Sequence, residues 1–302
     1  MSERPRNLAL GALCMIGSAL LFAMLGAIVK RLSADLATPT VVFLRNFFGL
    51  LTLVPWLYIH RKEGVRTKLR ALHLLRAATG LSAMYCWFYA YRIVPLAEVD
   101  VLSKSLPLFI PLIAWLGLKE KASSTSLLAI AVGFLGVMLV IRPGSMAFLP
   151  GHLIVILGGA LGAGAMVTIR RLSSEEPIIR IVFYFGLIST VVSALGPILH
   201  PEAVPRTLWP WVILLGCTAT SGQLLLTKAY SLAPASQVAP FSYATVIFSA
   251  LFAWVFWRER MDTLSWAGAG VIGLAGLIAG RQVGRRARSS AVVGRPGNTR
   301  EG

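Results

Sequence analysis

The residues best suited to bind or move charge lie inside long apolar segments. Glu98, Asp100 and Lys104 belong to the segment 96–117, and Arg45 belongs to the segment 38–59. An ionised side chain near the centre of a bilayer costs about 2.5 to 3.5 kcal/mol even on an insertion-based scale, so such residues need partners or water. Asp100 and Lys104 are four residues apart and share one face of a helix. Two interpretations stay open here: a buried ion pair, or a site that binds a charged ligand.

Other polar and aromatic side chains lie deep enough in apolar segments to line a cavity. These candidate substrate-binding residues are Tyr85, Gln223, Ser242 and Tyr243.

Prolines interrupt two of the apolar segments. Pro107 and Pro111 follow Lys104 closely, and Pro240 lies near the start of the segment 236–257. A proline removes one helical hydrogen bond and frees a carbonyl group, which can serve as a ligand or as a hinge. These three prolines are therefore candidate hinge residues, although a tolerated kink is equally consistent with the sequence.

The composition indicates that the chain lies in a membrane. Of its 302 residues 56% are hydrophobic and 14% are charged, with a mean hydropathy of +0.74, whereas about 25% of residues are charged in soluble domains. The net charge of +17 comes from short basic clusters between apolar runs. No motif organises these clusters for DNA or RNA, so a nucleic-acid partner is not expected.

Ten apolar segments have about the length that a membrane-spanning helix needs. They are 8–29, 38–59, 71–91, 96–117, 124–141, 151–169, 178–199, 209–229, 236–257 and 263–280. Sixteen Lys and Arg residues fall on the side of the N-terminus and seven on the opposite side. Because basic residues favour the cytoplasmic side, both termini are expected in the cytoplasm. Residues 1–7 form a short N-terminus, and the basic stretch 282–302 is expected to be a disordered tail.

The stretch 90–120 occurs a second time as 229–259, at a constant offset of 139 residues. Ten of the 31 aligned positions are identical, among them the pairs Pro95/Pro234 and Glu120/Glu259. The chain is therefore a duplication, with units at 8–142 and 150–281. Five spans in each unit is an odd number, so the second unit enters the bilayer from the opposite side. The sequence predicts an all-α membrane protein of ten transmembrane helices, built as two inverted five-helix repeats.

The repeat slightly favours a functional role for the charges. The positions equivalent to Glu98, Asp100, Lys104 and Arg45 are Gln237, Ala239, Tyr243 and Val182. If these charges only formed ion pairs that stabilise the scaffold, the duplicated unit would more naturally have kept them as well. Lys104 and Arg45 are therefore candidates for binding an anionic group, and Asp100 or Glu98 for binding an amine or carrying a coupled proton.

Several other chemistries have no matching pattern. The three cysteines, Cys14, Cys86 and Cys217, lie far apart, which favours neither a disulfide framework nor a thiolate metal site. The chain has no GxxxxGK[ST] phosphate loop, and its four histidines are scattered. An enzyme, a metal site and a cofactor are therefore not expected.

These features carry a family resemblance. The paired units, Lys30 after the first span, Arg45 in the second, the Pro95 turn and the span ends at 118–120 and 257–259 resemble EamA-type members of the drug/metabolite transporter superfamily. The resemblance implies a bacterial inner-membrane exporter or exchanger of a small polar metabolite, such as an amino acid, vitamin, nucleotide-related compound or metallophore. Export by alternating access with proton antiport is the first expectation. Uptake, exchange and a lipid-carrier flippase are the alternatives, and a homodimer could form.

Overall fold

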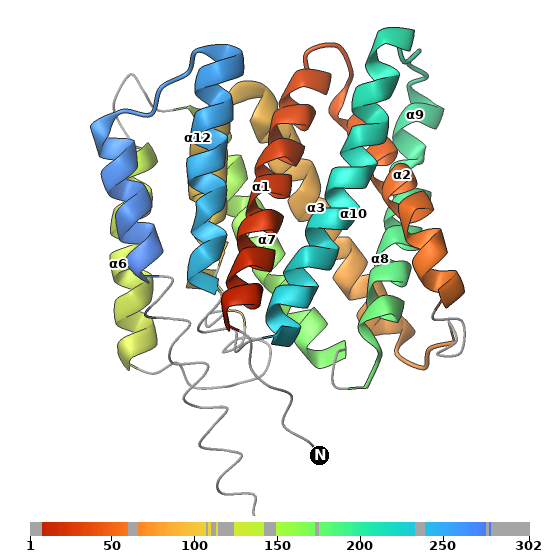
Figure 1. Cartoon of the computed structure of the whole chain (residues 1–302), viewed down its shortest axis with the longest axis horizontal. Helices are drawn as coiled ribbons and strands as arrows, with labels where there is room; N and C mark the ends of the chain where they lie inside the picture. Colours follow the sequence, from red (N-terminus) through yellow and green to blue (C-terminus); the bar gives the residue numbers. More distant parts are fainter. Residues whose placement is uncertain are drawn as a thin grey trace, which may run out of the picture.

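The described part of the protein, in a computed structural model, comprises residues 8–59, 66–106, 108–109, 113, 124–141, 149–172, 175–232, 239–275 and 278. These residues are helical and contain no strand, and the helices stand side by side in one bundle (Figure 1). The helices of the first repeat are α1 (Leu8–Leu32), α2 (Thr38–Ile59), α3 (Arg70–Ile93), α4 (Leu96–Ser103) and α6 (Ser124–Ile141). Those of the second are α7 (Pro150–Leu172), α8 (Ile178–Ser193), α9 (Leu195–Leu199), η2 (Arg206–Leu208), α10 (Trp209–Leu232), η3 (Ala239–Tyr243), α12 (Ala244–Trp257) and a last helix, Thr263–Ala275.

A helix falls on each of the ten predicted segments, and the predicted bounds of 38–59 and 124–141 coincide with α2 and α6. Within the described residues, five stretches have the length and apolar composition needed to cross a membrane. They are Ala9–Leu32, Thr38–Pro55, Pro150–Ile169, Ile179–Leu199 and Arg206–Leu226. Large apolar side chains point outward from these helices, including Leu13, Leu51, Leu157 and Ile198, as expected for surfaces that face lipid.

Some predicted segments are not single α-helices. In 178–199, α8 ends at Ser193 and the short α9 follows Ala194. Pro197 explains this break, because it has no N–H to donate and its ring would clash with the carbonyl group four residues earlier. The α-helix at the start of 96–117 ends at Ser103, and the described part of 236–257 begins with a 3₁₀ helix, at positions that matter for the site below.

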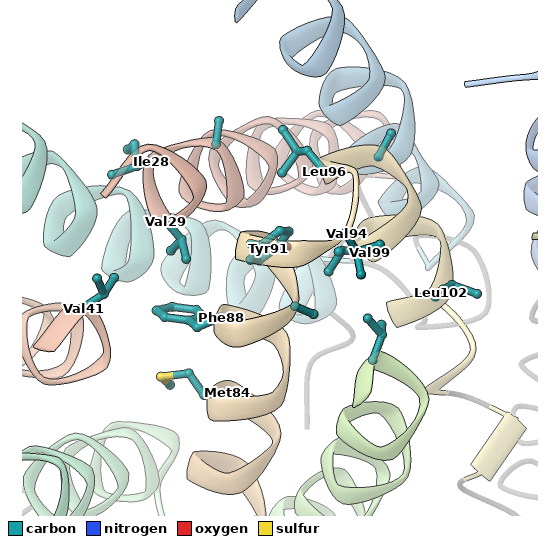
Figure 2. Close-up of a cluster of buried hydrophobic side chains, with 14 of the residues drawn as sticks. Ile28, Val29, Val41, Met84, Phe88, Tyr91, Val94, Leu96, Val99 and Leu102 are labelled. Carbon is teal, nitrogen blue, oxygen red and sulfur yellow. The ribbon is translucent and has the colours of Figure 1, made fainter. Parts of the chain in front are cut away.

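The main core lies where α1, α2, α3 and the start of α4 meet. Figure 2 shows Val29 of α1, Val41 of α2 and Phe88 of α3 directed toward this centre, while Ile28 lies on another side of α1 and Leu96 of α4 lies against α1. Each of these five side chains is at most 5% exposed. Dispersion contacts between closely packed side chains hold such a core together when lipid surrounds the bundle.

The two repeats share the centre of the bundle. α1 lies along α10 (Figure 1), where the Ser18 hydroxyl donates a 2.9 Å hydrogen bond to the carbonyl oxygen of Gly222. α2 packs against α8 and α10, α3 against α7, and α4 against α12. Side chains of the first repeat therefore face those of the second along most of the interior.

Candidate functional site

The helix that carries Asp100 stops near the middle of its predicted segment. α4 ends at Ser103, and Lys104 and Ser105 form a turn. Their N–H groups bond to the carbonyl oxygens three residues earlier, at 3.1 and 3.0 Å, which is the tighter 3₁₀ pattern. The interruption therefore begins before Pro107. Pro107 and Pro111, two of the predicted hinge residues, lie outside the described residues.

In the second repeat a 3₁₀ helix lies at the equivalent position, directly before α12. The offset of 139 residues maps Lys104 onto Tyr243, which is the last residue of the 3₁₀ helix η3, and α12 begins at Ala244. Pro240, the third predicted hinge residue, lies inside η3. In transporters built from inverted repeats, non-α-helical backbone at corresponding positions of the two halves is associated with the substrate site.

Asp100 is a buried carboxylate held by neutral donors. It is 4% exposed and accepts hydrogen bonds from the hydroxyl of Tyr91 at 2.7 Å and from the hydroxyl of Ser249 on α12. Figure 2 shows Tyr91 at the end of α3, close to the start of α4. These two hydroxyl groups satisfy the hydrogen-bonding capacity of a buried carboxylate, one from the same repeat and one from the other.

Lys104 does not form the buried ion pair that the sequence left open. No ion pair joins it to Asp100 among the described side chains. Because Lys104 lies in a turn and not in a further turn of α4, its side chain reaches across to the second repeat. Its Nζ lies 3.4 Å from the Thr245 hydroxyl, which donates a 2.8 Å hydrogen bond to the carbonyl oxygen of Ser242.

Asp100 and Lys104 thus contact α12 through hydroxyl groups one helical turn apart. These groups, on Thr245 and Ser249, were missed by sequence reasoning. The available signal was two hydroxyl residues four positions apart in an otherwise apolar helix. Together the four side chains form an acid, a base and two hydroxyl groups between the repeats, which we call the α4–α12 site.

Glu98, two residues before Asp100 on α4, forms a second polar contact. Its carboxylate lies 2.9 Å from Nε2 of His152, which is fully buried on α7. Nδ1 of His152 accepts the N–H of Leu149 at 3.2 Å, so the neutral ring carries its proton on Nε2 and donates it to Glu98. Glu98 also borders a small recess with Pro95, Ala97, Ala250, Ala253, Glu259, Arg260 and Met261.

Glu259 closes the same end of the bundle. Its carboxylate pairs with Lys30 at the end of α1 and accepts the N–H of Leu96 at 3.2 Å. Arg258 lies between α12 and Glu259 in a left-handed conformation with φ of 57°. This conformation costs about 1 to 2 kcal/mol for a residue other than glycine, and it turns the chain so that Glu259 faces the first repeat.

The remaining predicted site residues lie apart from the α4–α12 site. Arg45 on α2 donates a 3.0 Å hydrogen bond to the side-chain oxygen of Asn46. Tyr85 is half-buried against the main core, and Gln223 is exposed on α10. The hydroxyl of Tyr243 donates a 3.2 Å hydrogen bond to the carbonyl oxygen of Ile272, which anchors η3 to the last helix.

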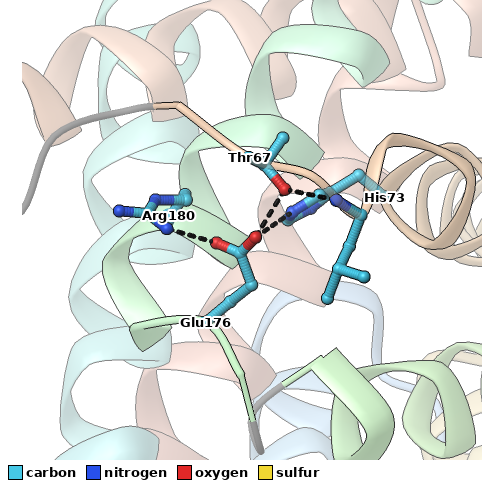
Figure 3. A network of polar contacts seen from close by, with 5 residues as sticks. Thr67, His73, Glu176 and Arg180 are labelled. Carbon is cyan, nitrogen blue, oxygen red and sulfur yellow. Dashed lines mark hydrogen bonds and ion pairs between the residues drawn. The ribbon is translucent and has the colours of Figure 1, made fainter.

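A polar network joins the repeats at the opposite end of the bundle (Figure 3). The hydroxyl of Thr67 and the guanidinium of Arg180 both donate to Glu176, and His73 lies 3.9 Å from the same carboxylate. Burial opposes ionisation of Glu176, but the hydrogen bonds from Thr67 and Arg180 and the charge of Arg180 outweigh it, so the pKa of Glu176 lies below its usual value. No group of three or more His, Cys, Asp or Glu side chains within the described ranges could hold a metal ion.

The sequence and the fold can be compared with those of known proteins. The EamA-like transporter family matches residues 9–142 and again residues 149–280. The pseudopaline exporter of Pseudomonas aeruginosa is 32% identical over 271 residues, which cover 88% of this chain and 94% of the exporter.

Other similar proteins are named as transporters of other compounds. A riboflavin transporter of Brucella anthropi is 28% identical, covering 89% of this chain and 97% of that protein. An S-adenosylmethionine uptake transporter of Rickettsia felis is 29% identical, covering 80% of this chain and 83% of that protein. One solved crystal structure superposes with a TM-score of 0.61 at 19% identity over 91% of this chain and 98% of the other, a likeness that concerns the fold.

Proposed function

The chain belongs to the EamA-like transporter family, and from this premise we propose that it is a secondary active exporter of a small polar metabolite. Transport proceeds by alternating access, with proton antiport as the driving reaction. The substrate belongs to the amino acids, vitamins, nucleotide-related compounds or metallophores. The family assignment makes the chain a multi-pass membrane protein.

The proposed arrangement has ten spanning helices in two inverted repeats, 8–142 and 150–281. Both termini, residues 1–7 and the tail 282–302, lie in the cytoplasm, and the membrane is the bacterial inner membrane. In Figure 1, α1 rises from the end of the bundle where the N-terminus lies, and α7 runs down from the opposite end. The opposite directions of these equivalent first helices support the inverted arrangement.

One observation carries the proposal: the chain departs from α-helix at Lys104 in the first repeat and has a 3₁₀ helix, η3, at the equivalent position of the second, and Asp100 and Lys104 contact α12 directly after η3. Rocking of one repeat against the other would change these contacts directly. Lys104 and Ser242 are then substrate-binding groups near the centre, and Asp100 carries the coupled proton. Glu98, with its histidine partner, is the second proton-coupling candidate.

The other predicted residues have supporting roles in this proposal. Tyr85, Gln223 and Tyr243 line the substrate path as the repeats move, and Arg45 binds an anionic part of the substrate. Pro107, Pro111 and Pro240 are hinge residues beside the two interruptions.

Purified protein in lipid vesicles tests the proposal. Counterflow of radiolabelled riboflavin, S-adenosylmethionine, pseudopaline and a set of amino acids would be measured first, followed by accumulation under an imposed pH gradient. At least one compound should exchange, and it should accumulate against its gradient when protons move the other way. Protein that is folded but exchanges none of these compounds would overturn the assignment of substrate class.

Uptake or exchange is the second candidate, because relatives of similar identity are named both as exporters and as uptake transporters. Reversing the pH gradient distinguishes the two directions. A lipid-carrier flippase is the third candidate, and fluorescent lipid translocation in the same vesicles, without movement of any soluble compound, would favour it.

A further inference from the structure

Two arginines lie inside the bundle, away from the α4–α12 site. Arg45 is on α2, and Arg76, which sequence reasoning did not single out, is on α3. These helices and α8 of the second repeat pack against one another, at the side of the bundle where Figure 1 shows α2 and α8. The two guanidinium groups are close enough to repel each other.

Neither guanidinium is neutralised by a carboxylate among the described residues. Nε of Arg45, and both Nε and Nη1 of Arg76, are buried without a hydrogen-bond partner from the described protein. Structural arginines in a membrane protein normally pair with acids or with backbone carbonyls. The two side chains are half-buried, and three of their buried N–H groups lack an acceptor among the described residues, which a bound anion would supply.

The surroundings of the arginines are polar and partly unpaired as well. Asn46 accepts a hydrogen bond from Arg45 and reaches the Ser193 hydroxyl on α8 at 3.4 Å. One turn earlier on α8, Ser189 is fully buried and its hydroxyl has no hydrogen-bond partner from the described protein. A buried, unpartnered donor beside two cations has the chemistry to complete an oxyanion site.

The guanidinium of Arg76 is also held in a defined position. It stacks over the ring of Phe185 on α8, with its central carbon 4.1 Å from the ring centre. The absence of a side chain at Gly80 leaves room for it, since a Cβ there would lie 1.8 Å from Nη1. Gly80 is one turn further into α3, so the side chain extends toward the interior and not toward the helix end.

We propose that Arg45 and Arg76, with Ser189, form a binding site for the oxyanionic group of a soluble metabolite, between α2, α3 and α8. The planar guanidinium group of an arginine can donate two parallel hydrogen bonds to a carboxylate or a phosphate. This inference rests on the proposed function only in that the bound molecule is the transported one. It adds that the substrate carries an anionic group, which is recognised jointly by both repeats.

Thermal unfolding of the purified full-length protein at constant ionic strength tests the site without a transport assay. Succinate is the carboxylate probe, its neutral analogue succinamide is the control for shape, and inorganic phosphate is the second oxyanion. Succinate or phosphate should stabilise the protein saturably, and succinamide should not. Phosphatidylglycerol compared with phosphatidylcholine tests a lipid headgroup as the source of the anion. Stabilisation by phosphatidylglycerol alone, or equal stabilisation by succinate and succinamide, would overturn the proposal.

Variants then link binding to the two arginines. Arg45→Met and Arg76→Met should each weaken the apparent affinity for the oxyanion by about tenfold or more, because a charge-assisted hydrogen-bonding group is lost. Without ligand, both variants should unfold at the wild-type temperature or above it, since an unpaired buried charge has been removed. Arg92→Met, at an exposed position of α3, is the matched control and should leave the affinity unchanged. A lower unfolding temperature with unchanged affinity would show that the arginines are structural.

Two further variants keep the test decisive if a methionine variant folds poorly. Arg76→Lys keeps the charge but not the fork, so affinity should fall less than in Arg76→Met. Gly80→Ala keeps Arg76 and displaces its guanidinium, so affinity should fall, whereas Gly164→Ala, which meets Thr79 at an ordinary 3.6 Å, should have no effect. Unchanged binding in Gly80→Ala and Arg76→Lys would contradict the site. Vesicle transport measured in parallel separates failure of this inference from failure of the transporter assignment.

Discussion

Lys30, at the end of α1, forms an ion pair with Glu259, which follows α12 and lies 229 positions later in the chain. The contact joins the first repeat to the second at the end of the bundle opposite the N-terminus. Its two side chains are 12% and 29% exposed, and the Lys30 ammonium also lies 5.3 Å from the ring centre of Trp257. The Thr67–Glu176 contact joins the repeats at the other end, so each end of the bundle has its own polar connection between the repeats.

Loss of the Lys30–Glu259 pair should destabilise the protein. Lys30→Met is expected to lower the free energy of unfolding by about 1 to 3 kcal/mol, because Glu259 is left partly buried without its cation. Thermal or denaturant unfolding in detergent measures this change. Arg31→Met, which removes an exposed pair with Asp35 on the same helix, should change stability by no more than about 0.5 kcal/mol.

Exchanging the two charges tests the geometry of the same contact. The double variant Lys30→Glu with Glu259→Lys should recover only part of the lost stability, because the ammonium introduced at position 259 cannot accept the N–H of Leu96. Complete recovery would show that the contact with Leu96 contributes nothing.

Asp100 should carry the coupled proton. Asp100→Asn is expected to abolish accumulation driven by a pH gradient while leaving counterflow exchange measurable, because exchange need not move a net proton. Glu98→Gln tests the second candidate in the same assay, and Tyr91→Phe removes only one hydrogen bond to Asp100. If both amide variants still concentrate substrate under the gradient, neither carboxylate is the coupling group.

Lys104 should be important for binding and not for folding. Its described protein contact is a 3.4 Å interaction with the Thr245 hydroxyl, so Lys104→Ala is expected to change the free energy of unfolding by less than about 1 kcal/mol. Substrate affinity should fall clearly, and Asp100→Ala in the same chain should not restore it. A loss of about 3 to 5 kcal/mol that the double variant recovers would instead identify a buried ion pair.

Glu176 should make stability depend on pH in the acidic range. Its pKa in the folded protein lies below the ordinary value of 4.5, so it stabilises the fold fully above that value. The stabilisation is lost as the pH falls through the folded-state pKa. Glu176→Gln should therefore lower the free energy of unfolding at pH 7 by about 1 to 3 kcal/mol. The unfolding temperature should fall accordingly, and its dependence on pH in the acidic range should become flatter. Glu175→Gln, at the exposed neighbouring position, should leave the profile unchanged.

Reporter fusions test the inverted arrangement. A reporter after Arg281 and one between Glu63 and Thr67 should both be cytoplasmic, and one between Gly144 and Leu149 should lie outside. The reason is the excess of Lys and Arg on the proposed inner side. Detection of the first and third reporters on the same side would rule out ten spans with inverted repeats.

The helical class and the positions of the helices could be predicted from the amino-acid sequence alone. In lipid, the backbone N–H and C=O groups of a long apolar segment find their hydrogen-bond partners within a helix. A helix therefore falls on each of the ten predicted segments. The turn at Lys104 could be expected from Pro107, which cannot donate to the carbonyl group of Ser103, and the 3₁₀ helix in 236–257 contains Pro240. The break after Ser193 was missed because the effect of Pro197 was not considered.

Only the tertiary structure decided which charges meet. Asp100 and Lys104 share a helical face in the sequence pattern, yet they contact Ser249 and Thr245 of the other repeat because the chain turns at Lys104. Arg76 lies inside the predicted segment 71–91, as Arg45 lies inside 38–59, but its significance comes from Arg45 on a neighbouring helix and from Phe185 on α8. Helical periodicity specifies neighbours within one element, whereas partners more than a hundred residues apart are set by how the two repeats pack.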